Sequence, residues 1–368
     1  MERLDAELVR SLAAFRSEGT AVSCYLGLDP SEVPNDRALS SRVTSLVDRV
    51  HEAGAPPDVA DRIEQFLTDG LDRDELLGVA LFDSSVGGVA SQVGLAAPVE
   101  DAAHVGSSFV LAPLLPQLER RRDVVLAAVG RDRGSIWLVR DGRAIERDEM
   151  SRDGQSQHDQ GGWSQSRYAR ARDNEALDHM RGVAEAIATA VPEGSDRLLA
   201  VACLQEQRSA FEELLEPHVR DALVGWIDFE AHADAVELLP DAQRLLDEHI
   251  AREQNALVER WREERGQRSG RATDSWETTL AAAADGSVES LLLLDGREDD
   301  AFECPQCGRG YVAAGTCDLD GTTLEQVPGG AREVAARATL LNGGEVRVLD
   351  ADLDGADVAA LLRYPQPA

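Results

Sequence analysis

Hydrophobic positions in the first third of the chain follow helical and strand-like spacing in turn. Residues 2–17 place apolar side chains at helical spacing, and residues 20–28 form an apolar run typical of a strand. Two further helical patterns within residues 36–70 are separated by Gly54-Ala55-Pro56-Pro57. Short strands are then expected near 77–83, 87–93 and 107–112. The pattern predicts a small α/β unit that ends near Pro113–Pro116.

A second unit begins with the continuous apolar run Asp123–Val129, which is typical of a buried strand. Strands at 134–140 and 143–148 follow, joined by Asp141-Gly142, a strong hairpin signal. Residues 151–166 then break the pattern with a polar, glycine-rich stretch. The elements expected beyond it are a helix at 167–190, a strand at 197–203, a helix at 206–216, a strand at 222–228 and a long helix at 239–266. Three strands followed by alternating helices and strands indicate an α/β layer resembling ribonuclease H.

The last third predicts another α/β unit that is interrupted by cysteines. Its expected elements are a helix at 275–284, a strand at 287–294, a Cys-bearing insert at 302–325, a helix at 330–341, a strand at 345–350 and a helix at 354–363. The fold class is therefore α/β in three domains. We expect an N-terminal domain at 1–118, a central domain at 119–268 and a C-terminal α/β sandwich at 269–368.

The composition of the chain indicates which residue types fill the cores and in which compartment we expect the protein. Hydrophobic residues make up 43% of the chain but aromatic residues only 4%, so Leu, Val and Ala must fill the cores. No apolar run approaches the roughly 20 residues that cross a bilayer. The first residues lack the apolar core of a signal peptide, and we expect a cytoplasmic protein without membrane contact. Cys24 and Cys203 lie in apolar runs and are expected to be buried and inert.

The charge of the chain reverses in one stretch. The formal net charge is −31, and every basic residue is an arginine, because the sequence contains no lysine. Strong acidity disfavours non-specific nucleic-acid binding, since phosphate neutralisation supplies most of that affinity. Glu119 to Arg172 nevertheless carries twelve arginines against nine acidic residues. Any contact with RNA must therefore come from local arginine clusters.

The loop at 151–166 contains the most informative motif, Gly161-Gly162-Trp163-Ser164-Gln165. Two adjacent glycines allow backbone conformations that other residues avoid and let a substrate approach the main chain. Arg167, Arg170 and Arg172 follow at once, and the first two share a face of the expected helix. The motif predicts a polar tip on a cationic helix. The alternative is a solvated linker whose arginines have no specific partner.

The three-strand meander, the Gly-Gly loop and the arginine-bearing helix resemble the central domain of archaeal and eukaryotic class I release factors. The chain is more similar still to their bacterial, actinobacterial-type relatives and to the ribosome quality-control peptidyl-tRNA hydrolases, a superfamily that includes Pelota and Balon. The resemblance covers all three domains in order. It implies contact with large-subunit ribosomal RNA and with peptidyl-tRNA, and makes a translational GTPase a further candidate partner.

In that superfamily a Gly-Gly-Gln or Gly-Ser-Gln tip enters the peptidyl transferase centre. Here Trp163 stands where a strict Gly-Gly-Gln has its glutamine, and it separates Gly162 from Ser164-Gln165. Two interpretations stay open. Either Gln165 takes the catalytic glutamine's role, which we favour, or the tip is remodelled and inactive.

Ester hydrolysis needs a positioned water and stabilisation of the developing oxyanion, which neutral amide and backbone N–H groups can provide. Gly161, Gly162, Ser164 and Gln165 are therefore the candidate catalytic residues, and no catalytic cofactor is expected. Arg167, Arg170 and Arg172 are the candidate RNA-binding residues, because a guanidinium binds phosphate through two hydrogen bonds. His158 is a weaker candidate for a general base, since most loop histidines are solvated.

A second motif is Cys304-Pro305-Gln306-Cys307-Gly308, followed by Cys317 and Asp320. A Cys-x-x-Cys-Gly knuckle is a strong zinc signal, and the spacing puts Asp320 where a complete ribbon has its fourth cysteine. Carboxylates also ligate zinc, so Cys304, Cys307, Cys317 and Asp320 are candidate ligands of a structural zinc ion. The alternative is a ribbon that keeps its turns without metal.

The remaining patterns favour structural roles. Arginines near the end of the long helix, with Trp261 among them, fit either RNA contact or a solvated helix with internal ion pairs, and we favour the second. Trp226 and Trp276 are expected in cores. Asp123 and Asp132 suit strand-end turns as well as nuclease metal ligands. No phosphate-binding P-loop motif is present.

Two functions therefore fit the sequence. The first is an enzyme that hydrolyses peptidyl-tRNA on stalled ribosomes or large subunits without reading a codon. The second is a hibernation factor that occupies the ribosomal A site without catalysis. The N-terminal domain carries no recognisable stop-codon motif, which disfavours ordinary termination.

Overall fold

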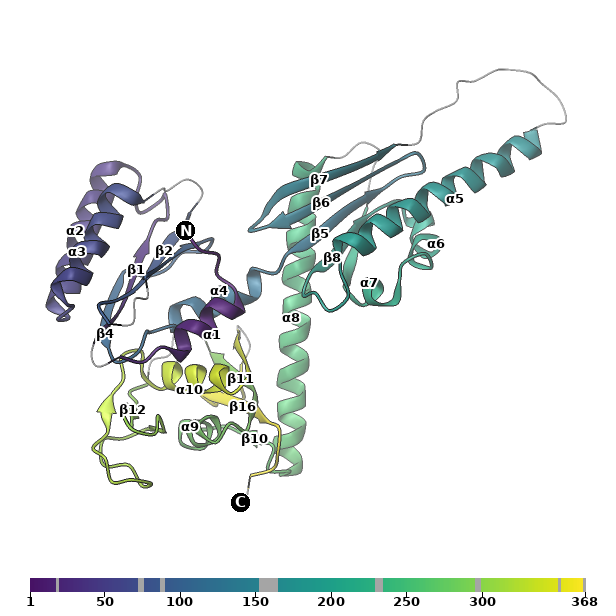
Figure 1. Cartoon of the computed structure of the whole chain (residues 1–368). Coiled ribbons are helices and arrows are strands. Elements are labelled where there is room, and N and C mark those ends of the chain that lie inside the picture. Colours follow the sequence, from purple (N-terminus) through teal and green to yellow (C-terminus); the bar gives the residue numbers. More distant parts are fainter. Residues whose placement is uncertain are drawn as a thin grey trace. The chain divides into compact units, whose positions relative to one another are not determined.

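The chain forms two compact units: Met1–Glu119 together with Glu253–Ala368, and Arg120–Arg252 (Figure 1). The computed structural model describes all residues except 18–19, 72–75, 87–89, 152–164, 229–233, 295–298, 350–351 and 367–368. Within the described part, no helix is long and apolar enough to cross a membrane.

The N-terminal part of the first unit is an antiparallel sheet with helices on both faces. Its strands follow the order β3-β2-β1-β4, with bounds β1 Ala21–Gly27, β2 Gly78–Ser84, β3 Ala90–Leu95 and β4 Ala102–Gly106. One face is covered by α2 (Asp36–Glu52), α3 (Pro57–Gln65) and the turn η1 (Phe66–Gly70), whose apolar side chains pack on Val22, Cys24 and Leu26. The other face packs on α1 (Ala6–Ala14). The two helices expected within 36–70 are confirmed.

The expected strand at 107–112 is wrong. The fourth strand is β4, and the chain then bends into the 3-10 turn η2 (Ala112–Leu114) and the helix α4 (Leu115–Arg120). Phe109, Val110 and Leu111 are buried without being part of the sheet. A short apolar run signals burial, but its pattern alone does not fix the backbone conformation.

The C-terminal part of the first unit is a four-stranded mixed sheet. The strands follow the order β10-β16-β11-β15, with bounds β10 Ala272–Thr273, β11 Val288–Leu294, β15 Glu345–Leu349 and β16 Val358–Leu362. The helices α9 (Trp276–Ala284) and α10 (Gly330–Leu341) pack on one face, and the later turns of α8 (Ala235–Gln267) pack on the other through Val258 and Trp261.

The helix expected at 354–363 is wrong, because this segment forms the strand β16. It pairs antiparallel with β10 and with β11, and all five of its side chains are buried. A continuous apolar run of five residues shows no period that separates helix from strand. The position between two neighbouring strands decides the conformation.

A buried carboxylate joins the N-terminal and C-terminal parts of the first unit. Glu333 on α10 is fully buried, and its Oε2 accepts the backbone N–H groups of Leu111 at 2.7 Å and Ala112 at 2.8 Å. Arg337, one turn later, lies 3.5 Å from the other carboxylate oxygen and donates to Ser108 and to Glu303. Burial raises the pKa of the Glu333 carboxyl. Apolar side chains from both parts surround this network in one core.

A small sheet carries the cysteines. Its strands β12 (Phe302–Glu303), β13 (Gly310–Tyr311) and β14 (Glu325–Gln326) follow the order β13-β12-β14. The insert joins the larger core through buried Ala301, whose carbonyl accepts the N–H of Val327 at 2.9 Å.

The second unit is a five-stranded sheet of order β7-β6-β5-β8-β9. The bounds are β5 Val124–Val129, β6 Arg133–Arg140, β7 Arg143–Ser151, β8 Leu198–Ala202 and β9 Leu223–Ile227. The first three strands form the expected antiparallel meander, whereas β8 and β9 run parallel to β5. The expected hairpin at Asp141-Gly142 is confirmed, with φ angles of 50° and 77°. The second unit is therefore a mixed α/β layer, as its sequence pattern predicts.

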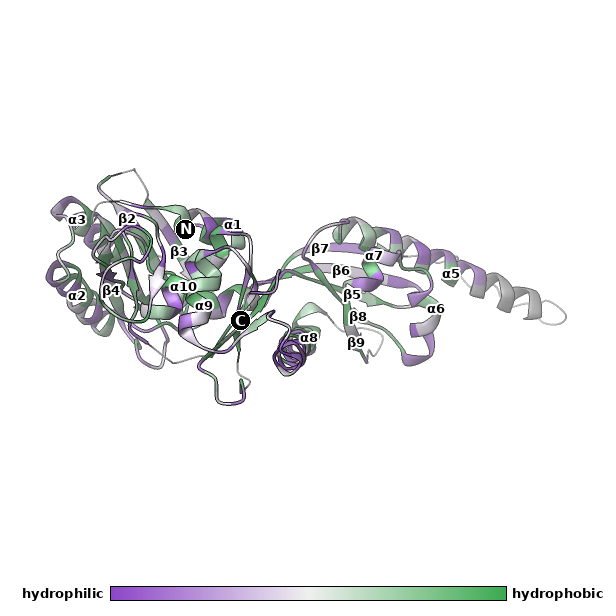
Figure 2. Cartoon of the chain, turned by 90° about the horizontal axis from the view of Figure 1, so that it is seen from below, coloured by the Kyte–Doolittle hydropathy of each residue, from purple (hydrophilic) through white to green (hydrophobic). Residues whose placement is uncertain are grey.

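Both faces of this sheet are covered, because alternate strand residues are apolar on each side. Val124, Leu126 and Ala128 face the first turns of α8, whereas Val125, Ala127 and Val129 face the opposite layer of helices. That layer consists of α5 (Gln165–Ala190), α6 (Arg208–Glu212) and α7 (Pro217–Asp221). Figure 2 shows hydrophobic residues concentrated on the strands and polar ones on the outer sides of helices. The single helix expected at 206–216 is instead the turn η3 (Gln205–Gln207) and α6, followed by α7.

Two glycines set the distance between this sheet and its helices. A Cβ atom on Gly134 in β6 would lie 2.6 Å from Cγ2 of Val183 on α5. A Cβ atom on Gly225 in β9 would lie 2.6 Å from Cδ2 of Leu245 on α8. Such separations are too short for carbon atoms, so a larger residue would force the facing side chain or its helix to shift.

We expect Gly134→Ala to lower the free energy of unfolding of the second unit by about 1–3 kcal/mol, because the new methyl group overpacks the contact with Val183. Gly182→Ala on α5 is the matched control. A Cβ atom at this position would meet nothing within 4 Å, so alanine should stabilise the helix by up to about 1 kcal/mol. Thermal unfolding followed by circular dichroism measures both, and equal midpoints for the two variants would refute the close-approach argument.

We expect Glu333→Ala to destabilise the first unit by about 3–5 kcal/mol, because it removes the acceptor of the Leu111 and Ala112 N–H groups and the buried counter-charge of Arg337. Urea unfolding followed by tryptophan fluorescence measures the loss. Glu345→Ala is the control, since the Glu345 side chain is 60% exposed and pairs with Arg347, its neighbour on the same strand. A Glu333 variant as stable as the control would contradict the structural role.

Candidate functional site

The polar loop between β7 and α5 holds most of the candidate catalytic residues. Gly161, Gly162 and Ser164 lie outside the described residues, as do Trp163 and His158. Gln165 is the first residue of α5, and the side chains of Gln165, Arg167, Arg170 and Arg172 are also outside the description. What the structure supplies is the scaffold on either side of the loop.

That scaffold consists of an edge strand and a long helix. β7 pairs with β6 from Arg143 to Ser151 and leads directly into the loop. The helix α5 spans 26 residues, and its first described buried side chain is Met180. At 1.5 Å per residue, Gln165 lies roughly 22 Å along the helix axis from Met180. The buried part of α5, from Met180 to Ile187, anchors the helix on the sheet.

The Cys insert brings its four candidate ligands together. Donor atoms of Cys304, Cys307, Cys317 and Asp320 all lie within 4.8 Å of one another. The Sγ atoms of Cys307 and Cys317 are 3.7 Å apart, and Cys304 Sγ lies 3.5 Å from a carboxylate oxygen of Asp320. Tetrahedral zinc with Zn–S bonds of about 2.3 Å places two sulfurs roughly 3.8 Å apart. The donor set and its spacing therefore fit a tetrahedral metal site.

Two tight turns produce this convergence. Gly308 donates its N–H to the Cys304 carbonyl at 2.8 Å, and Gly321 donates to the Cys317 carbonyl at 2.9 Å. Both glycines have positive φ, 73° and 74°, a conformation that other residues adopt only with strain. The two knuckles thus turn all four ligand side chains toward one point.

Neighbouring polar groups shift the pKa values of the candidate ligands. The Tyr311 hydroxyl donates to Cys317 Sγ at 3.4 Å, and this hydrogen bond lowers the pKa of the Cys317 thiol. Hydrogen bonds from Thr322 lower the pKa of Asp320. Desolvation raises the pKa of the Cys307 thiol to about 11 in the absence of any cation. A divalent ion would reverse that last effect, because metal-bound thiols lose their protons.

The remaining cysteines are structural. Cys24 and Cys203 are buried and free, as expected. Burial raises the pKa of the Cys24 thiol to about 12 and that of Cys203 to about 11. Both therefore stay protonated and unreactive near neutral pH.

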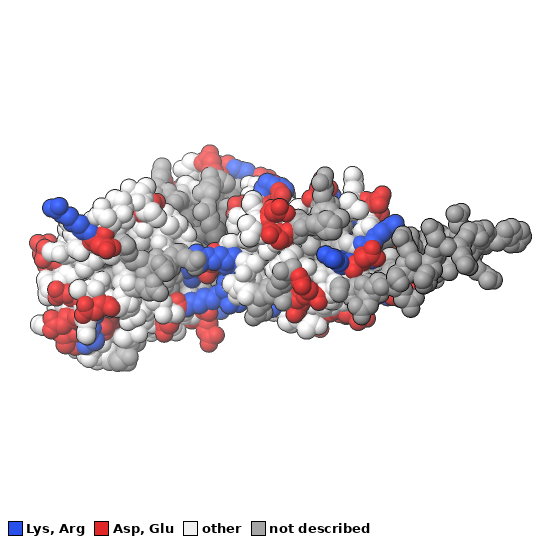
Figure 3. All heavy atoms as spheres, turned by 90° about the horizontal axis from the view of Figure 1, so that it is seen from above, with Lys and Arg blue, Asp and Glu red and all other residues white. Residues whose placement is uncertain are grey.

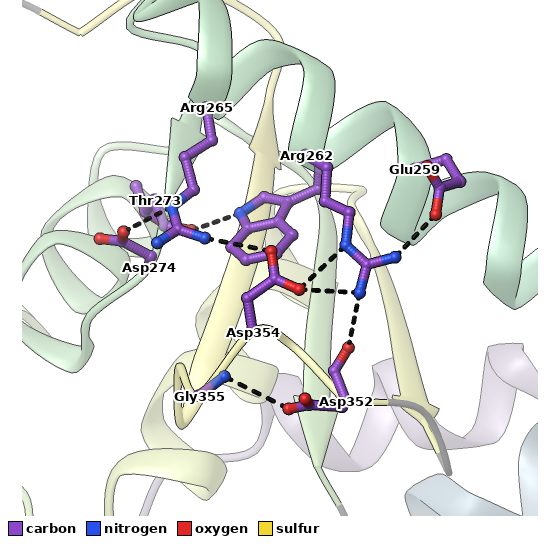
Figure 4. Close-up of polar contacts among 9 residues, drawn as sticks. Glu259, Arg262, Arg265, Thr273, Asp274, Asp352, Asp354 and Gly355 are labelled. Carbon is purple, nitrogen blue, oxygen red and sulfur yellow. Dashed lines mark hydrogen bonds and ion pairs between the residues drawn. The ribbon is translucent and has the colours of Figure 1, made fainter.

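The arginines near the end of α8 are engaged inside the first unit. Arg262 bonds to Asp354 and Glu259, and Arg265 pairs with Asp274 at 3.0 Å (Figure 4). Arg265 also lies over the ring of Trp261, 5.0 Å from its centroid. Trp261 is fully buried and donates its indole N–H to the Thr273 carbonyl at 2.9 Å. These contacts support the structural interpretation of this segment.

Asp123, a candidate nuclease ligand, is held by arginine. Arg140 donates to both of its carboxylate oxygens, at 3.0 and 2.7 Å. Within the described residues, the Cys insert is the one cluster of three or more potential metal-binding side chains. Sequence reasoning missed the buried pair Glu333 and Arg337, because a Glu–Arg pair at i,i+4 is typical of an exposed helix face.

Comparison with known proteins supports the sequence resemblance. Residues 122–259 match the family described as the Actinobacteria/chloroflexi VLRF1 release factor. Peptide chain release factor subunit 1 of Archaeoglobus fulgidus is 24% identical over 289 residues, covering 71% of this chain and 70% of the relative. The Thermococcus kodakarensis protein of the same name is 25% identical over 211 residues and is matched over 51% of its length.

Solved structures similar to this chain include Saccharomyces cerevisiae Dom34, a translation termination-like factor. Its identity is 11%, with coverage of 99% of this chain and 94% of that chain and a TM-score of 0.43. The archaeal translation termination factor aRF1 is 16% identical, with coverage of 98% and 99% and a TM-score of 0.26. Residues 122–259 thus resemble a release factor domain of the VLRF1 type, and the chain is similar to archaeal peptide chain release factors over about 70% of its length.

Proposed function

We propose that this protein binds ribosomes and hydrolyses the peptidyl-tRNA ester on stalled ribosomes or large subunits, without reading a codon. The observation that carries the proposal is the match of residues 122–259 to a release factor family, because this segment includes the whole Gly-Gly loop and the helix that follows it. The archaeal relatives are themselves named as peptide chain release factors.

In the proposed reaction, water attacks the carbonyl carbon of the ester, and the terminal ribose oxygen of the tRNA leaves with a proton. Gln165 orients the water through its backbone N–H or its side-chain amide. Gly161 and Gly162 let the main chain approach the ester, and Ser164 adds a small polar group. Hydrogen-bond donors fixed before the reaction stabilise the developing oxyanion without a protein nucleophile.

The cationic start of α5 is the proposed RNA contact of the loop. Arg167 and Arg170 are three residues apart on the helix and therefore share a face, and Arg172 follows within the same turns. Their guanidinium groups would bind phosphates of ribosomal RNA or of the tRNA. A translational GTPase that delivers the protein remains a candidate partner.

The second candidate function is a hibernation factor that occupies the A site without catalysis. The specific observation in its favour is Trp163, which separates the glycines from Ser164 and Gln165. A bulky indole in the tip would change the register in which glutamine meets the ester.

For the Cys insert we propose a structural zinc ion held by Cys304, Cys307, Cys317 and Asp320. When bound, the ion supplies four bonds that fix the two knuckles, which a short insert with only two-residue strands otherwise lacks. The proposal rests on the convergence and spacing of the donor atoms.

We expect Gln165→Ala to slow release of labelled peptide from purified peptidyl-tRNA–ribosome complexes by about 100-fold or more, the usual cost of losing one oxyanion or water-positioning group. Gln65→Ala, an exposed substitution on α3, is the control and should release peptide at the wild-type rate. Wild-type protein that co-sediments with 70S ribosomes but releases no peptide would favour the hibernation function over hydrolysis.

We expect the purified chain to contain about one zinc ion, and Asp320→Asn to weaken zinc binding roughly 10- to 100-fold because a neutral amide is a poorer ligand. Competition with a chromogenic chelator measures the affinity. Asp300→Asn is the matched control, since Asp300 is an exposed carboxylate at the base of the same insert. Equal affinity of the two variants would remove Asp320 from the ligand set.

A further inference from the structure

The four candidate metal ligands of the Cys insert lie in two contacting pairs. The sulfur of Cys304 is 3.5 Å from a carboxylate oxygen of Asp320, whereas the sulfurs of Cys307 and Cys317 are 3.7 Å apart. Cys304 therefore meets a carboxylate, which forms no bond with an oxidised thiol, while Cys307 and Cys317 meet each other. Among the three cysteines of the insert, this arrangement favours Cys307 and Cys317 as the partners of a disulfide.

Solvent reaches the two sulfurs of this pair unequally. All five cysteines are within the described residues, and Cys307 alone among them is exposed. It follows exposed Pro305 and Gln306 in the first knuckle, whereas Cys317 is only 3% exposed. A small oxidant that arrives from solvent would therefore react with Cys307 first. Cys317 is then the neighbouring thiol that can complete a disulfide.

The distance between the two sulfurs is compatible with such a bond. A disulfide has a sulfur–sulfur length of about 2.0 Å, so the sulfurs of Cys307 and Cys317 have to approach by roughly 1.7 Å. Rotation of two cysteine side chains can supply a shift of this size. The backbone turns at Gly308 and Gly321 place the two sulfurs next to each other, because each knuckle carries one of them.

The negative charge of the insert indicates which oxidants can approach. Residues 302–325 contain four acidic residues and one arginine, Arg309, which pairs with Asp285 at 2.7 Å. Carboxylates are also scattered widely over the described surface in the view of Figure 3. Like charges repel, so this surface disfavours anionic oxidants and anionic thiols such as glutathione. A neutral peroxide meets no such barrier.

A disulfide in this pair would leave too few ligands for a metal ion. Structural zinc takes four protein ligands, and the thiolate is the form of cysteine that binds metal. With Cys307 and Cys317 joined, only Cys304 and Asp320 would remain as ligands. The site would then lose its ion, and a covalent bond would connect the two knuckles in place of the metal.

We propose that Cys307 is the site of a reversible oxidation by peroxide, in which a Cys307–Cys317 disulfide forms and the metal ion is released. The proposal rests on the structural zinc ion proposed above and adds a way to regulate it. The disulfide replaces one link between the knuckles by another, so the insert stays closed in both states.

The oxidation proceeds in two steps. The Cys307 thiolate attacks one oxygen of hydrogen peroxide, which gives a sulfenic acid and hydroxide. The Cys317 thiolate then attacks the Cys307 sulfur and expels a second hydroxide. In sum, two thiolates, one hydrogen peroxide and two protons give one disulfide and two waters. Zinc(II) is released without a change in oxidation state.

The test treats the purified full-length chain, reconstituted with an equimolar amount of zinc, with hydrogen peroxide. We expect the thiols titrated after unfolding to fall from five per chain to three, because two are consumed by the disulfide. About one zinc ion per chain should appear on a chromogenic chelator, and peptide mass mapping should show the Cys307–Cys317 bond. A dithiol reductant with added zinc should restore both the thiols and the bound metal.

The matched control is Cys203→Ser, which removes a buried cysteine outside the insert. This variant should lose two thiols and about one zinc ion, as the wild type does. A variant that loses neither would show that Cys203 takes part in the oxidation and would overturn the pairing.

Five remaining thiols and a retained zinc ion in the treated wild type would overturn the oxidation site and leave the structural zinc standing. Zinc release with a bond between Cys304 and either other cysteine of the insert, or with damage that the reductant does not reverse, would equally overturn it. A chain that takes up no zinc but still forms the Cys307–Cys317 bond would defeat the proposed ion and its release, and would support Cys307 as the oxidation site.

Discussion

The buried carboxylate of Glu333 is the contact on which the first unit depends. An ionisable group without solvent is tolerated only when hydrogen bonds and a counter-charge replace water. Here two backbone N–H groups of the segment that follows the N-terminal sheet and the guanidinium of Arg337 fill that role. Segments more than two hundred residues apart in sequence are thereby tied together, because separating them would leave donors and acceptor buried without partners.

The second unit depends on contacts of another kind. Its sheet is apolar on both faces, so α5 and α8 each pack their apolar side chains against one face. Glycines in the sheet at the two closest contacts allow these helices to lie near the strands. The result is a rigid anchor for the buried half of α5. A long helix held at one end can present its other end with a defined direction, since helices bend only gently. This property suits the proposed hydrolysis, in which a short loop has to be positioned against an ester.

Much of this architecture could be predicted from sequence, since the meander, the hairpin and the long helices follow from period and turn chemistry. The predictions that were wrong fall on apolar runs that are too short to show either a helical or a strand period. Residues 107–112 and the strand β16 are apolar runs whose backbone is decided by their neighbours. The convergence of Cys304, Cys307, Cys317 and Asp320 could be predicted because their spacing in the sequence is local. The buried pair Glu333 and Arg337 could not, because the groups that Glu333 binds come from a segment more than two hundred residues away.

The residue before Cys304 links the Cys insert to the rest of the first unit. Glu303 directly precedes Cys304, and its carboxylate bonds to Arg337 and, at 3.0 Å, to Arg16 near the N-terminus. The residue next to Cys304 is therefore an anion shared by α10 and the N-terminal segment. A change in the backbone at Cys304 would consequently act on the ion pairs that join the N-terminal segment to α10.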